Sequence, residues 1–333
     1  METTALTDLI LSAIENELHC TIDSAGITQP DGLYPLMAYH MGWEGESVAG
    51  KRIRPLLLLL TTSAAGGIWE NALPAAAAVE LIHNFSLIHD DIEDDSPLRR
   101  GRPTVWNRWG IPLAINAGDA MFSLAHLSIL RLQENIDCDS VLKAAQILQD
   151  TCLSLTKGQH LDMLFEDRND ISLDDYWQMV SGKTASLLSA ATELGAVIAS
   201  ARPSVQTHYQ EFGYNLGLAY QAQDDLLGVW GDVSATGKST ESDLVSGKKS
   251  LPIIFALTQK GPFADRWRKG PIRTQEIPEL AHQLELEGAQ AYTVECAEFF
   301  TNKALSALAD AEPDGQAGKM LSELAGKLLK RNL

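Results

Sequence analysis

Cysteine, basic residues and long apolar runs are all scarce in this chain of 333 residues. The four cysteines (Cys20, Cys138, Cys152 and Cys296) form no CxxC pair, so neither a disulfide framework nor a zinc site is expected. This cysteine usage predicts a reducing, cytoplasmic location. The longest conspicuous apolar run, Leu56–Leu60, is far too short to cross a bilayer. We therefore expect no stable membrane insertion.

Positive charge is also in short supply. The chain has 26 Lys and Arg against 44 Asp and Glu, which gives a net charge of −18. Such a chain has no basic stripe to follow a phosphate backbone, so nucleic acid is excluded as a partner, and an anionic membrane surface is disfavoured. The first 20 residues contain acidic residues but no Lys or Arg, which argues against a signal or transit peptide.

The remaining composition is that of a globular protein, with 45% hydrophobic and 21% charged residues. Gly- and Pro-containing breakers leave helix-length segments that are rich in Ala, Leu, Gln, Glu and Met. Apolar residues recur at +4, +3 and +4 in Leu81, Phe85, Ile88 and Ile92, the spacing of a helix face. The sequence predicts one all-α domain over residues 1–333, built from ten or more helices.

Three aspartates stand close together in the segment His89–Asp94. Asp90 and Asp94 are four residues apart, so they share one face of a helix. Like charges at that spacing repel unless a cation lies between them, and Mg²⁺ takes one or two carboxylates together with substrate phosphates. A metal site at Asp90, Asp91 and Asp94 is one interpretation, and a solvated acidic helix end is the other.

A second acidic pair, Asp224 and Asp225, follows Gln221 at +3 and +4. All three side chains therefore lie on one helix face. Two acidic clusters that face each other across a cavity between helices would hold several metal ions and a diphosphate. The second pair thus favours the metal interpretation of the first.

The few basic residues are grouped beside glycine-containing loops. Arg suits bidentate recognition of phosphate, whereas Lys acts as a mobile point charge. Any one pair is explained at least as well by a solvated surface, but the whole set indicates a polyanion site. His83, two helical turns before Asp90, is either part of that site or a core histidine. The basic groups are Lys51, Arg52 and Arg54; Arg99, Arg100 and Arg102; Lys183; Lys238; and Lys248 and Lys249.

Taken in order, these motifs resemble those of the trans-isoprenyl diphosphate synthases, also called polyprenyl synthetases. The resemblance runs from about Gly50 to Pro252. It is carried by Gly50-Lys51-Arg52-Ile53-Arg54-Pro55, Asp90-Asp91-Ile92-Glu93-Asp94 followed by Arg99-Arg100-Gly101, Gly158-Gln159 with Asp162, Lys183-Thr184, Gln221 with Asp224-Asp225, Gly231-Asp232, Thr236-Gly237-Lys238 and Lys248.

The resemblance implies an isoprenoid-synthase helical bundle around a central cavity, and an enzyme that works as a homodimer. It implies that catalysis depends on Asp90, Asp94, Arg99, Lys183, Asp224 and Lys238. Three Mg²⁺ ions would be held by Asp90, Asp94 and Asp224, together with Asp91 and Asp225. The allylic diphosphate (dimethylallyl, geranyl or farnesyl) would contact Arg99, Lys183, Thr184, Gln221, Lys238 and Lys248. Isopentenyl diphosphate would bind Lys51, Arg54, His83 and Arg100.

Two positions depart from the family pattern. The second aspartate motif usually ends in Asp, and Gly228 takes that place here. Glycine has no side chain to bind a metal, so Asp224 and Asp225 must carry that motif. Relatives also often have glycine where this chain has Glu241, which puts the detail of that loop in doubt.

The length of the product depends on what blocks the cavity below Asp90. Phe85 lies five residues before Asp90, and the neighbouring Ser86 is small. An aromatic followed by a small residue resembles the archaeal type of geranylgeranyl diphosphate synthase, so we expect that product. Farnesyl and farnesylgeranyl diphosphate are the alternatives, since Phe85 is also explained as an ordinary core residue.

Three other functions are possible. A class I terpene cyclase shares the helical cavity and first aspartate motif but needs a different second motif. A non-catalytic subunit of a synthase would be expected to have lost its aspartate clusters, and this chain keeps both. An HD-type phosphohydrolase would use His89 with Asp90 and requires further histidine ligands.

Overall fold

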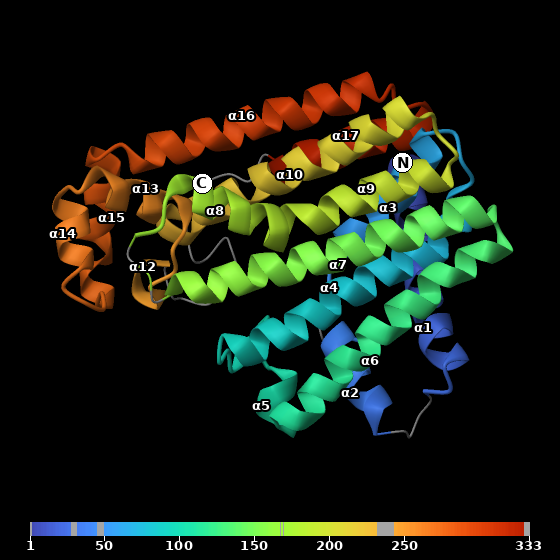
Figure 1. Cartoon of the computed structure of the whole chain (residues 1–333), viewed down its shortest axis with the longest axis horizontal. Helices are drawn as coiled ribbons and strands as arrows, with labels where there is room; N and C mark the ends of the chain where they lie inside the picture. Colours follow the sequence, from blue (N-terminus) through green and yellow to red (C-terminus); the bar gives the residue numbers. More distant parts are fainter. Residues whose placement is uncertain are drawn as a thin grey trace. The chain divides into compact units, whose positions relative to one another are not determined.

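The structure is a computed structural model that describes residues 2–27, 32–44, 50–166, 168, 170–231 and 243–329. Helices make up nearly all of its regular structure in these ranges (Figure 1). One short hairpin provides the two strands found there. The prediction of an all-α protein with ten or more helices is therefore confirmed.

The elements up to residue 134 follow one another with short connections. They are α1 (Glu2–Ser24), α2 (Leu33–Met41), α3 (Ile53–Ala64), the 3₁₀-helix η1 (Trp69–Ala72), α4 (Leu73–Glu93), β1 (Leu98–Arg99), β2 (Arg102–Pro103), α5 (Val105–Trp109), α6 (Ile111–Leu130) and the 3₁₀-helix η2 (Arg131–Glu134).

The later elements include the longest helices. They are α7 (Cys138–Glu166), α8 (Leu173–Val180), the π-helical turn η3 (Ser181–Ala185), α9 (Ser186–Ile198), α10 (Pro203–Trp230), α12 (Asp243–Ser246), α13 (Leu251–Gln259), α14 (Pro262–Trp267), the 3₁₀-helix η4 (Thr274–Glu276), α15 (Ile277–Leu286), α16 (Ala289–Asp310) and α17 (Gly315–Leu329).

The chain divides into two compact units. Unit 1 comprises Met1–Cys152, Ala190–Gln210 and Leu308–Ser322, and unit 2 comprises Leu153–Ser189, Glu211–Ala307 and Glu323–Leu333. Each unit is described by itself below. A single domain over residues 1–333 stays a prediction.

Unit 1 is organised around α4. This helix packs against α1, α3 and α6, and its segment Ala75–Val79 is buried throughout. The short alanine side chains leave room for neighbouring helices to approach closely. On α6, Gly118 meets α4 at His89: a Cβ atom at Gly118 would lie 2.3 Å from His89 Nε2. Small residues therefore fix the spacing around the helix that ends in the first aspartate motif.

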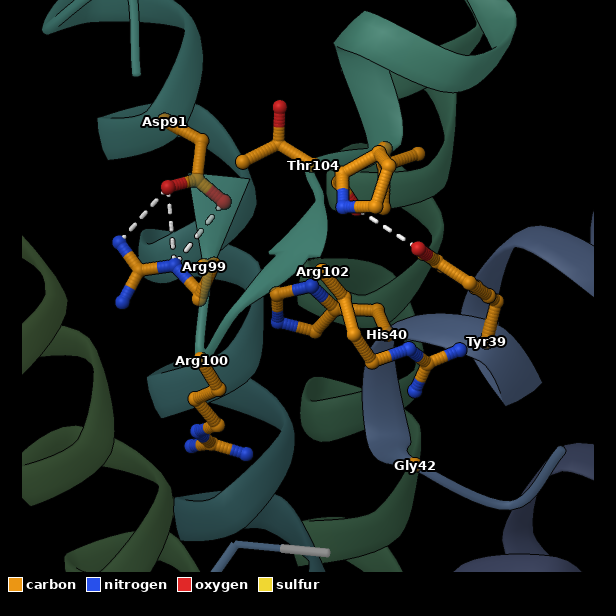
Figure 2. Close-up of a pocket in the computed structure, with 10 residues that line it drawn as sticks. Tyr39, His40, Gly42, Asp91, Arg99, Arg100, Arg102 and Thr104 are labelled. Atoms are coloured by element: carbon orange, nitrogen blue, oxygen red, sulfur yellow. Dashed lines mark hydrogen bonds and ion pairs between the residues drawn. The ribbon is translucent and has the colours of Figure 1, made fainter. Parts of the chain in front are cut away.

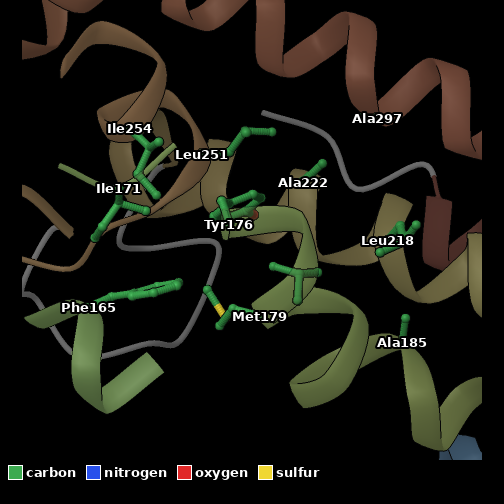
Figure 3. Close-up of a cluster of buried hydrophobic side chains, with 11 residues drawn as sticks. Phe165, Ile171, Tyr176, Met179, Ala185, Leu218, Ala222, Leu251, Ile254 and Ala297 are labelled. Carbon is green, nitrogen blue, oxygen red and sulfur yellow. The ribbon is translucent and has the colours of Figure 1, made fainter. Parts of the chain in front are cut away.

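Unit 2 has a core of aromatic and branched side chains from several helices (Figure 3). Tyr176 is 1% exposed and lies among Phe165 of α7, Leu251 of α13 and Ala222 of α10. Burial of this much apolar surface is the main force that holds the helices together. The core adjoins the second aspartate motif, since its member Ala222 lies on α10 between Gln221 and Asp225.

One stretch of the described residues, 111–134, is long and apolar enough to cross a membrane by length and composition, with 44% of its 18-residue window buried in the protein. Core helices of globular proteins pass the same test. In unit 1 this stretch packs along α4, so burial against α4 explains much of its apolar character.

All four cysteines are free thiols.

Candidate functional site

The first aspartate motif lies at the carboxyl end of α4. Asp90 belongs to the last turn, and Asp94 is the residue that caps the helix, with its N–H donated to the Asp90 carbonyl at 2.9 Å. The i, i+4 relation expected from the sequence is thus present. Asp94 is exposed and Asp90 is half-buried, which places both carboxylates where a ligand can reach them.

Asp91, between them, is oriented differently. Its side chain is 2% exposed and accepts hydrogen bonds from Arg99 Nε, at 2.8 Å to Oδ1 and 2.9 Å to Oδ2, with Arg99 Nη2 2.8 Å from Oδ1 (Figure 2). Burial raises the pKa of the Asp91 carboxyl, while Arg99 acts in the opposite direction. Asp91 therefore holds Arg99 in place, a contact that the sequence reading did not anticipate.

A two-residue turn carries the arginines that follow α4. Leu98 pairs with Pro103 and Arg99 with Arg102, and the turn residues between these pairs both have positive φ: 54° at Arg100 and 75° at Gly101. Two positive φ angles in succession are typical of the tight turn that matches strand twist, and glycine tolerates them readily. The hairpin thus places Arg99 next to Asp91 and places Arg100 in the turn, where it lines the pocket described next.

Arg100 lines a pocket with about 430 Å³ of empty space, part of it open to solvent. Its lining residues are Tyr39, His40, Gly42, Asp91, Arg99, Arg100, Arg102, Pro103, Thr104 and Val105. Burial, followed by the charges of Arg99 and Arg52, lowers the pKa of Arg100. His40 is affected similarly, with a pKa lowered to about 3 by burial and then by Arg99, Arg100 and Arg52. Crowded positive charge of this kind favours a bound anion.

The motif that begins at Gly50 contributes residues with different roles. Arg54 Nη1 lies 3.2 Å from His83 Nε2, so the structure brings together two of the residues predicted to bind isopentenyl diphosphate. Burial and then Arg54 lower the pKa of His83 well below its ordinary value. Lys51 is exposed. A Cβ atom at Gly50 would lie 3.3 Å from Arg100 Nη2, so this loop also approaches Arg100.

Arg52, in the same motif, is a structural residue. Its side chain is 3% exposed and makes ion pairs with Glu15 at 2.7 Å and with Glu80 at 2.8 Å, while Nη2 donates to the Met41 carbonyl. A charge this deeply buried has to be paired, because desolvation is costly. Arg52 therefore fixes the loop to α1, α2 and α4 within unit 1.

The second aspartate motif lies near the carboxyl end of α10 in unit 2. Asp225 is 1% exposed, and its Oδ2 accepts hydrogen bonds from Tyr176 OH at 2.6 Å and from the Leu251 N–H at 2.7 Å. Leu251 is the first residue of α13, where N–H groups have no partner within the helix. Asp225 thus caps α13. Burial raises its pKa, against the opposing effect of Lys248.

Gln221 connects Asp225 to Thr184. The amide donates from Nε2 to Asp225 Oδ1 at 2.8 Å, and its Oε1 accepts from Thr184 Oγ1 at 2.8 Å. Lys183 donates to Asp162 Oδ2 at 2.5 Å. The predicted residues Lys183, Thr184 and Gln221 are therefore brought together in unit 2, while Asp224 is half-buried beside them on α10.

Lys183 and Thr184 sit in η3, a single π-helical turn between α8 and α9. Turns of this kind occur often at functional sites. Glycines of the neighbouring helices allow it: a Cβ atom at Gly158 would lie 2.2 Å from Lys183 N, and one at Gly217 would lie 2.5 Å from Ala185 Cα. The Gly158 of the sequence motif is explained by this close approach.

Lys248 follows α12 and lies 3.9 Å from Asp225 Oδ1. Burial lowers the pKa of Lys248, but Asp225, Asp243 and Asp224 together raise it above its ordinary value. Lys248 is thus a cation held among carboxylates. Lys238 lies outside the described residues, as do Asp232, Thr236, Gly237 and Glu241.

The two residues expected to set product length are on α4. The ring of Phe85 packs edge-on against Phe122 of α6 and against His89, with centroid distances of 5.1 Å in both cases. Ser86 donates its hydroxyl to the His83 carbonyl at 2.8 Å. Phe122 in turn contacts His126. Phe85 is therefore backed by a second aromatic ring, which sequence spacing gave no means of finding.

The carboxylates present suit magnesium better than a metal that needs a complete protein cage. Among the described residues, no group of three or more His, Cys, Asp or Glu side chains is close enough to hold a metal ion. Mg²⁺ usually needs only one or two carboxylates, with phosphates and waters completing its shell. Asp90 and Asp94, one helical turn apart and not buried, fit that requirement. His89, the histidine of the phosphohydrolase alternative, has its Nε2 3.3 Å from the Ile115 carbonyl.

Comparison with known proteins agrees with this arrangement. Residues 39–280 match the model of the polyprenyl synthetase family. The chain is 44% identical over 240 residues to the (2E,6E)-farnesyl diphosphate synthase of Mycobacterium tuberculosis, which covers 70% of this chain and 65% of that protein. It is 35% identical over 306 residues to the geranylgeranyl diphosphate synthase of the same organism, covering 88% of this chain and 85% of that protein.

A solved structure shows the same likeness across the whole chain. The polyprenyl synthetase of Streptomyces coelicolor aligns with a TM-score of 0.87 and 33% identity, covering 98% of this chain and 99% of that one. The helical fold and the two aspartate motifs define an isoprenoid-synthase type of protein. More particularly, the chain belongs to the polyprenyl synthetase family.

Proposed function

We propose that this protein is a Mg²⁺-dependent prenyltransferase that joins isopentenyl diphosphate to an allylic diphosphate, head to tail and in trans, with geranylgeranyl diphosphate as the product. The observation that carries this proposal is the grouping of the motif residues. In unit 1, Asp90 and Asp94 lie at the end of α4, just before the hairpin that carries Arg99 and Arg100. In unit 2, Thr184 contacts Gln221, with Lys183 and Asp224 next to them along the chain. Family membership supports the same activity.

Within this proposal, a basic cluster of unit 1 serves isopentenyl diphosphate, and of its members Arg100 lines the pocket described above. Arg54, His83 and Arg100, with the exposed Lys51, hold its diphosphate, and no metal is needed because the residues themselves supply the positive charge. The lowered pKa of His83 keeps the ring neutral at pH 7. It can then donate one hydrogen bond to a phosphate oxygen while its Nε2 accepts from Arg54.

The other substrate, the allylic diphosphate, is bound at the aspartate motifs. The side chains that contact its diphosphate are Arg99, Lys183, Thr184, Gln221, Lys238 and Lys248. Asp90 and Asp94 of unit 1, and Asp224 of unit 2, would hold Mg²⁺, which would supply stabilisation of the negative charge that develops on the departing pyrophosphate. The basic side chains contribute to the same stabilisation in advance. Asp91 and Asp225 orient Arg99 and Gln221. The number of three Mg²⁺ ions stays a prediction. So does direct binding of a metal by Asp91 and Asp225.

The reaction needs no dedicated protein base. The C1–O bond of the allylic substrate breaks and its electron pair leaves with pyrophosphate. The double bond of isopentenyl diphosphate then attacks the allylic C1, and the proton lost from the new chain goes to pyrophosphate. The protein's task is to orient the two substrates and exclude water, which would otherwise capture the cation.

Chain length is set in this proposal by Phe85, supported from behind by Phe122. An aromatic ring held by a second ring makes a rigid stop, because neither can turn without losing the contact. Farnesyl diphosphate is the second candidate product. The specific observation that favours it is the 44% identity to a relative named as a farnesyl diphosphate synthase.

A product assay tests the proposal. Purified protein would receive Mg²⁺, isopentenyl diphosphate and dimethylallyl, geranyl or farnesyl diphosphate in turn, and dephosphorylated products would be separated by chain length. A product of twenty carbons is expected, whereas fifteen would establish the farnesyl alternative. Absence of elongation with every primer, from folded protein, would contradict the prenyltransferase and favour a cyclase or a non-catalytic subunit.

The variant Phe85→Ala tests the stop itself. It should shift products beyond the wild-type length, and Phe122→Ala should shift them less, since the Phe85 ring remains. Phe299→Ala is the matched control, because Phe299 is 53% exposed. An unchanged product distribution in Phe85→Ala would contradict the assigned role.

We also propose that the protein is a homodimer. Several large apolar side chains of α6 are exposed, among them Leu113 at 47% and Leu127 at 57%. Their burial against a second copy would be favourable. Light scattering coupled to size-exclusion chromatography should give a mass near twice 36.2 kDa, and a monomer mass at micromolar concentration would contradict the dimer.

A further inference from the structure

One carboxylate of the first helix contacts both ends of the connection between α2 and α3. Glu15, on α1, accepts a hydrogen bond from Trp43 Nε1 through its Oε2 at 2.8 Å. It also accepts from Arg52, with Nε 2.7 Å from Oε1 and Nη2 3.3 Å from Oε2. Trp43 lies just beyond the residue that caps the end of α2, and Arg52 is the residue that caps the start of α3. Glu15 therefore joins the two ends of this connection.

The two partners of Glu15 have a well-defined backbone. Gly42 ends α2 with a φ of 80°, and the Trp43 N–H donates back to the Ala38 carbonyl at 2.9 Å, as is common where a glycine closes a helix. Arg52 has a φ of 48°, a left-handed conformation that costs energy in a residue with a side chain. Such a conformation persists only where the surroundings impose it. The buried contacts of Arg52 therefore hold its backbone in place.

A second residue of α1 supports the same attachment. His19 lies four residues after Glu15, so both side chains project from one face of α1. The ring of His19 stacks on the ring of Trp43 at a centroid distance of 3.9 Å. Trp43 is thus held by α1 at its indole N–H and at its ring face. Both α1 residues precede the part of the chain that matches the family model, which begins at residue 39.

The residues next to Arg52 in the sequence are those proposed to hold isopentenyl diphosphate. Lys51 precedes Arg52 directly and is exposed. Arg54 follows two residues later, in the first turn of α3, with its Nη1 3.2 Å from His83 Nε2. A shift of the Arg52 backbone would therefore move both Lys51 and Arg54. The contacts that hold Arg52 also determine the spacing of these two cations.

Arg52 and Arg100 lie on either side of Gly50. A Cβ atom at Gly50 would lie 3.3 Å from Arg52 Nη1 and 3.3 Å from Arg100 Nη2. Two guanidinium groups this near repel each other, and carboxylates hold one of them: Arg52 pairs with Glu15 at 2.7 Å and with Glu80 at 2.8 Å. The Arg52 side chain is 3% exposed, whereas Arg100 is exposed. Arg100 is therefore the guanidinium that an anion can reach, and Arg52 is kept away from it.

We propose that Glu15 is a positioning residue for the binding of isopentenyl diphosphate. It holds Arg52, and through Arg52 it fixes Lys51 and Arg54 at the spacing that one diphosphate group requires, without touching the substrate itself. The inference rests on the proposed function, because that function names the ligand of these residues. Helix α1, which precedes every motif described above, thereby becomes a support of the substrate site.

The experiment measures the affinity for isopentenyl diphosphate by isothermal titration calorimetry, with a chelator present so that the aspartate motifs bind no metal. Glu15→Ala should raise the Kd about tenfold, an effect expected of a residue that acts on a ligand through its partners. Loss of a negative charge would by itself favour an anion, so weaker binding reports displaced groups. Glu15→Gln keeps an acceptor oxygen for its partners and should stay within about threefold of wild type.

Glu17→Ala is the matched control. Glu17 lies on the same helix and pairs with Arg131 Nη1 at 2.7 Å, also within unit 1. Its loss removes an ion pair of α1 without touching Arg52, so the thermal midpoint should fall while the Kd stays unchanged. In steady-state kinetics, Glu15→Ala should raise the KM for isopentenyl diphosphate and leave kcat and the KM for the allylic substrate unchanged. An equal rise of the Kd in both variants would show that α1 acts only through stability and would overturn the proposal.

A Kd in Glu15→Ala that equals or falls below the wild-type value would also overturn it. If Glu15→Ala does not fold, Trp43→Phe takes its place, because it removes the N–H donated to Glu15 and keeps a ring beside His19. Its Kd should rise about threefold, and an unchanged Kd would overturn the proposal. A wild type that binds no isopentenyl diphosphate overturns both the proposed function and this inference. A wild type that binds and elongates it, while Glu15→Ala keeps the wild-type Kd, overturns this inference alone.

Discussion

The middle aspartates of the two motifs can be compared directly. Asp91 and Asp225 follow Asp90 and Asp224 by one residue, and both are almost fully buried, at 2% and 1% exposed. Asp91 holds an arginine side chain that is 31% exposed, while Asp225 holds the buried hydroxyl of Tyr176 and the first N–H of α13. The same position in the motif thus anchors a partly exposed cation in one unit and buried neutral donors in the other. Each motif thus has a buried inner carboxylate with a structural partner and a less buried outer one, and under the proposed function the outer one, Asp90 or Asp224, binds the ligands.

The largest expected effect is on the catalytic rate, and it comes from the outer carboxylates, Asp90 and Asp224. Asp90→Asn and Asp224→Asn should each lower kcat for prenyl transfer by about 10²–10³-fold, because several kcal/mol of leaving-group stabilisation is lost. Their thermal midpoints should change little, since neither side chain is fully buried. Steady-state kinetics with calorimetric melting would check both statements. A loss of stability that matches the loss of rate would contradict the division of roles.

Next in size is the loss of the inner anchor in unit 2. Asp225→Ala leaves Tyr176 OH and the Leu251 N–H as buried donors without an acceptor, which costs about 1–3 kcal/mol each. We expect the free energy of unfolding in urea to fall by about 2–5 kcal/mol. Asp225→Asn, which retains an acceptor oxygen, is the control and should lose less than half as much.

The corresponding change in unit 1 should be smaller. Asp91→Ala releases Arg99, whose partly exposed guanidinium can be hydrated, so we expect a loss of about 1–2 kcal/mol. The KM for the allylic substrate should rise in this variant because Arg99 is no longer oriented. A larger loss of stability than in Asp225→Ala would contradict the comparison between a partly exposed partner and buried ones.

Acid pH gives the most gradual effect. The pKa of His40 is about 3 in the folded protein and about 6.5 in the unfolded chain. Between those values the unfolded state binds more protons, so stability falls as the pH falls below 6.5, by at most about 1.4 kcal/mol per pH unit. His40→Gln should flatten this slope in urea melts at pH 5 to 7. An identical slope in both proteins would show that other groups control it.

The fold was largely predictable because its causes are local. Helix-forming composition and the apolar spacing of Leu81, Phe85 and Ile88 are properties of short segments, and the structure confirms α4 over all of them. The grouping of Lys183, Thr184 and Gln221 was predictable only through the family resemblance. The position of a residue in the sequence does not show which helices pack against each other in the fold.

The partners of the motif residues were not predictable for the same reason. Tyr176 lies 49 residues from Asp225, and no spacing rule links a core tyrosine to a motif aspartate. Arg52 looked like one more phosphate-binding cation, yet its glutamate partners lie 37 and 28 residues away. Burial decides between a ligand contact and a structural ion pair, and burial depends on tertiary packing.

Because Ser181–Ala185 form a π-helical turn, the number of residues in this segment determines how its side chains are oriented. A π turn is an α-helix with one extra residue, and each residue of an α-helix turns the chain by about 100°. Deleting one residue would restore a regular helix with nearly unchanged helical content, but it would rotate the side chains on one side of the turn relative to the other. Lys183 would then lose Asp162, or Thr184 would lose Gln221. Residue count between α8 and α9 therefore encodes the direction of a side chain, and substitutions will be tolerated there more readily than a deletion.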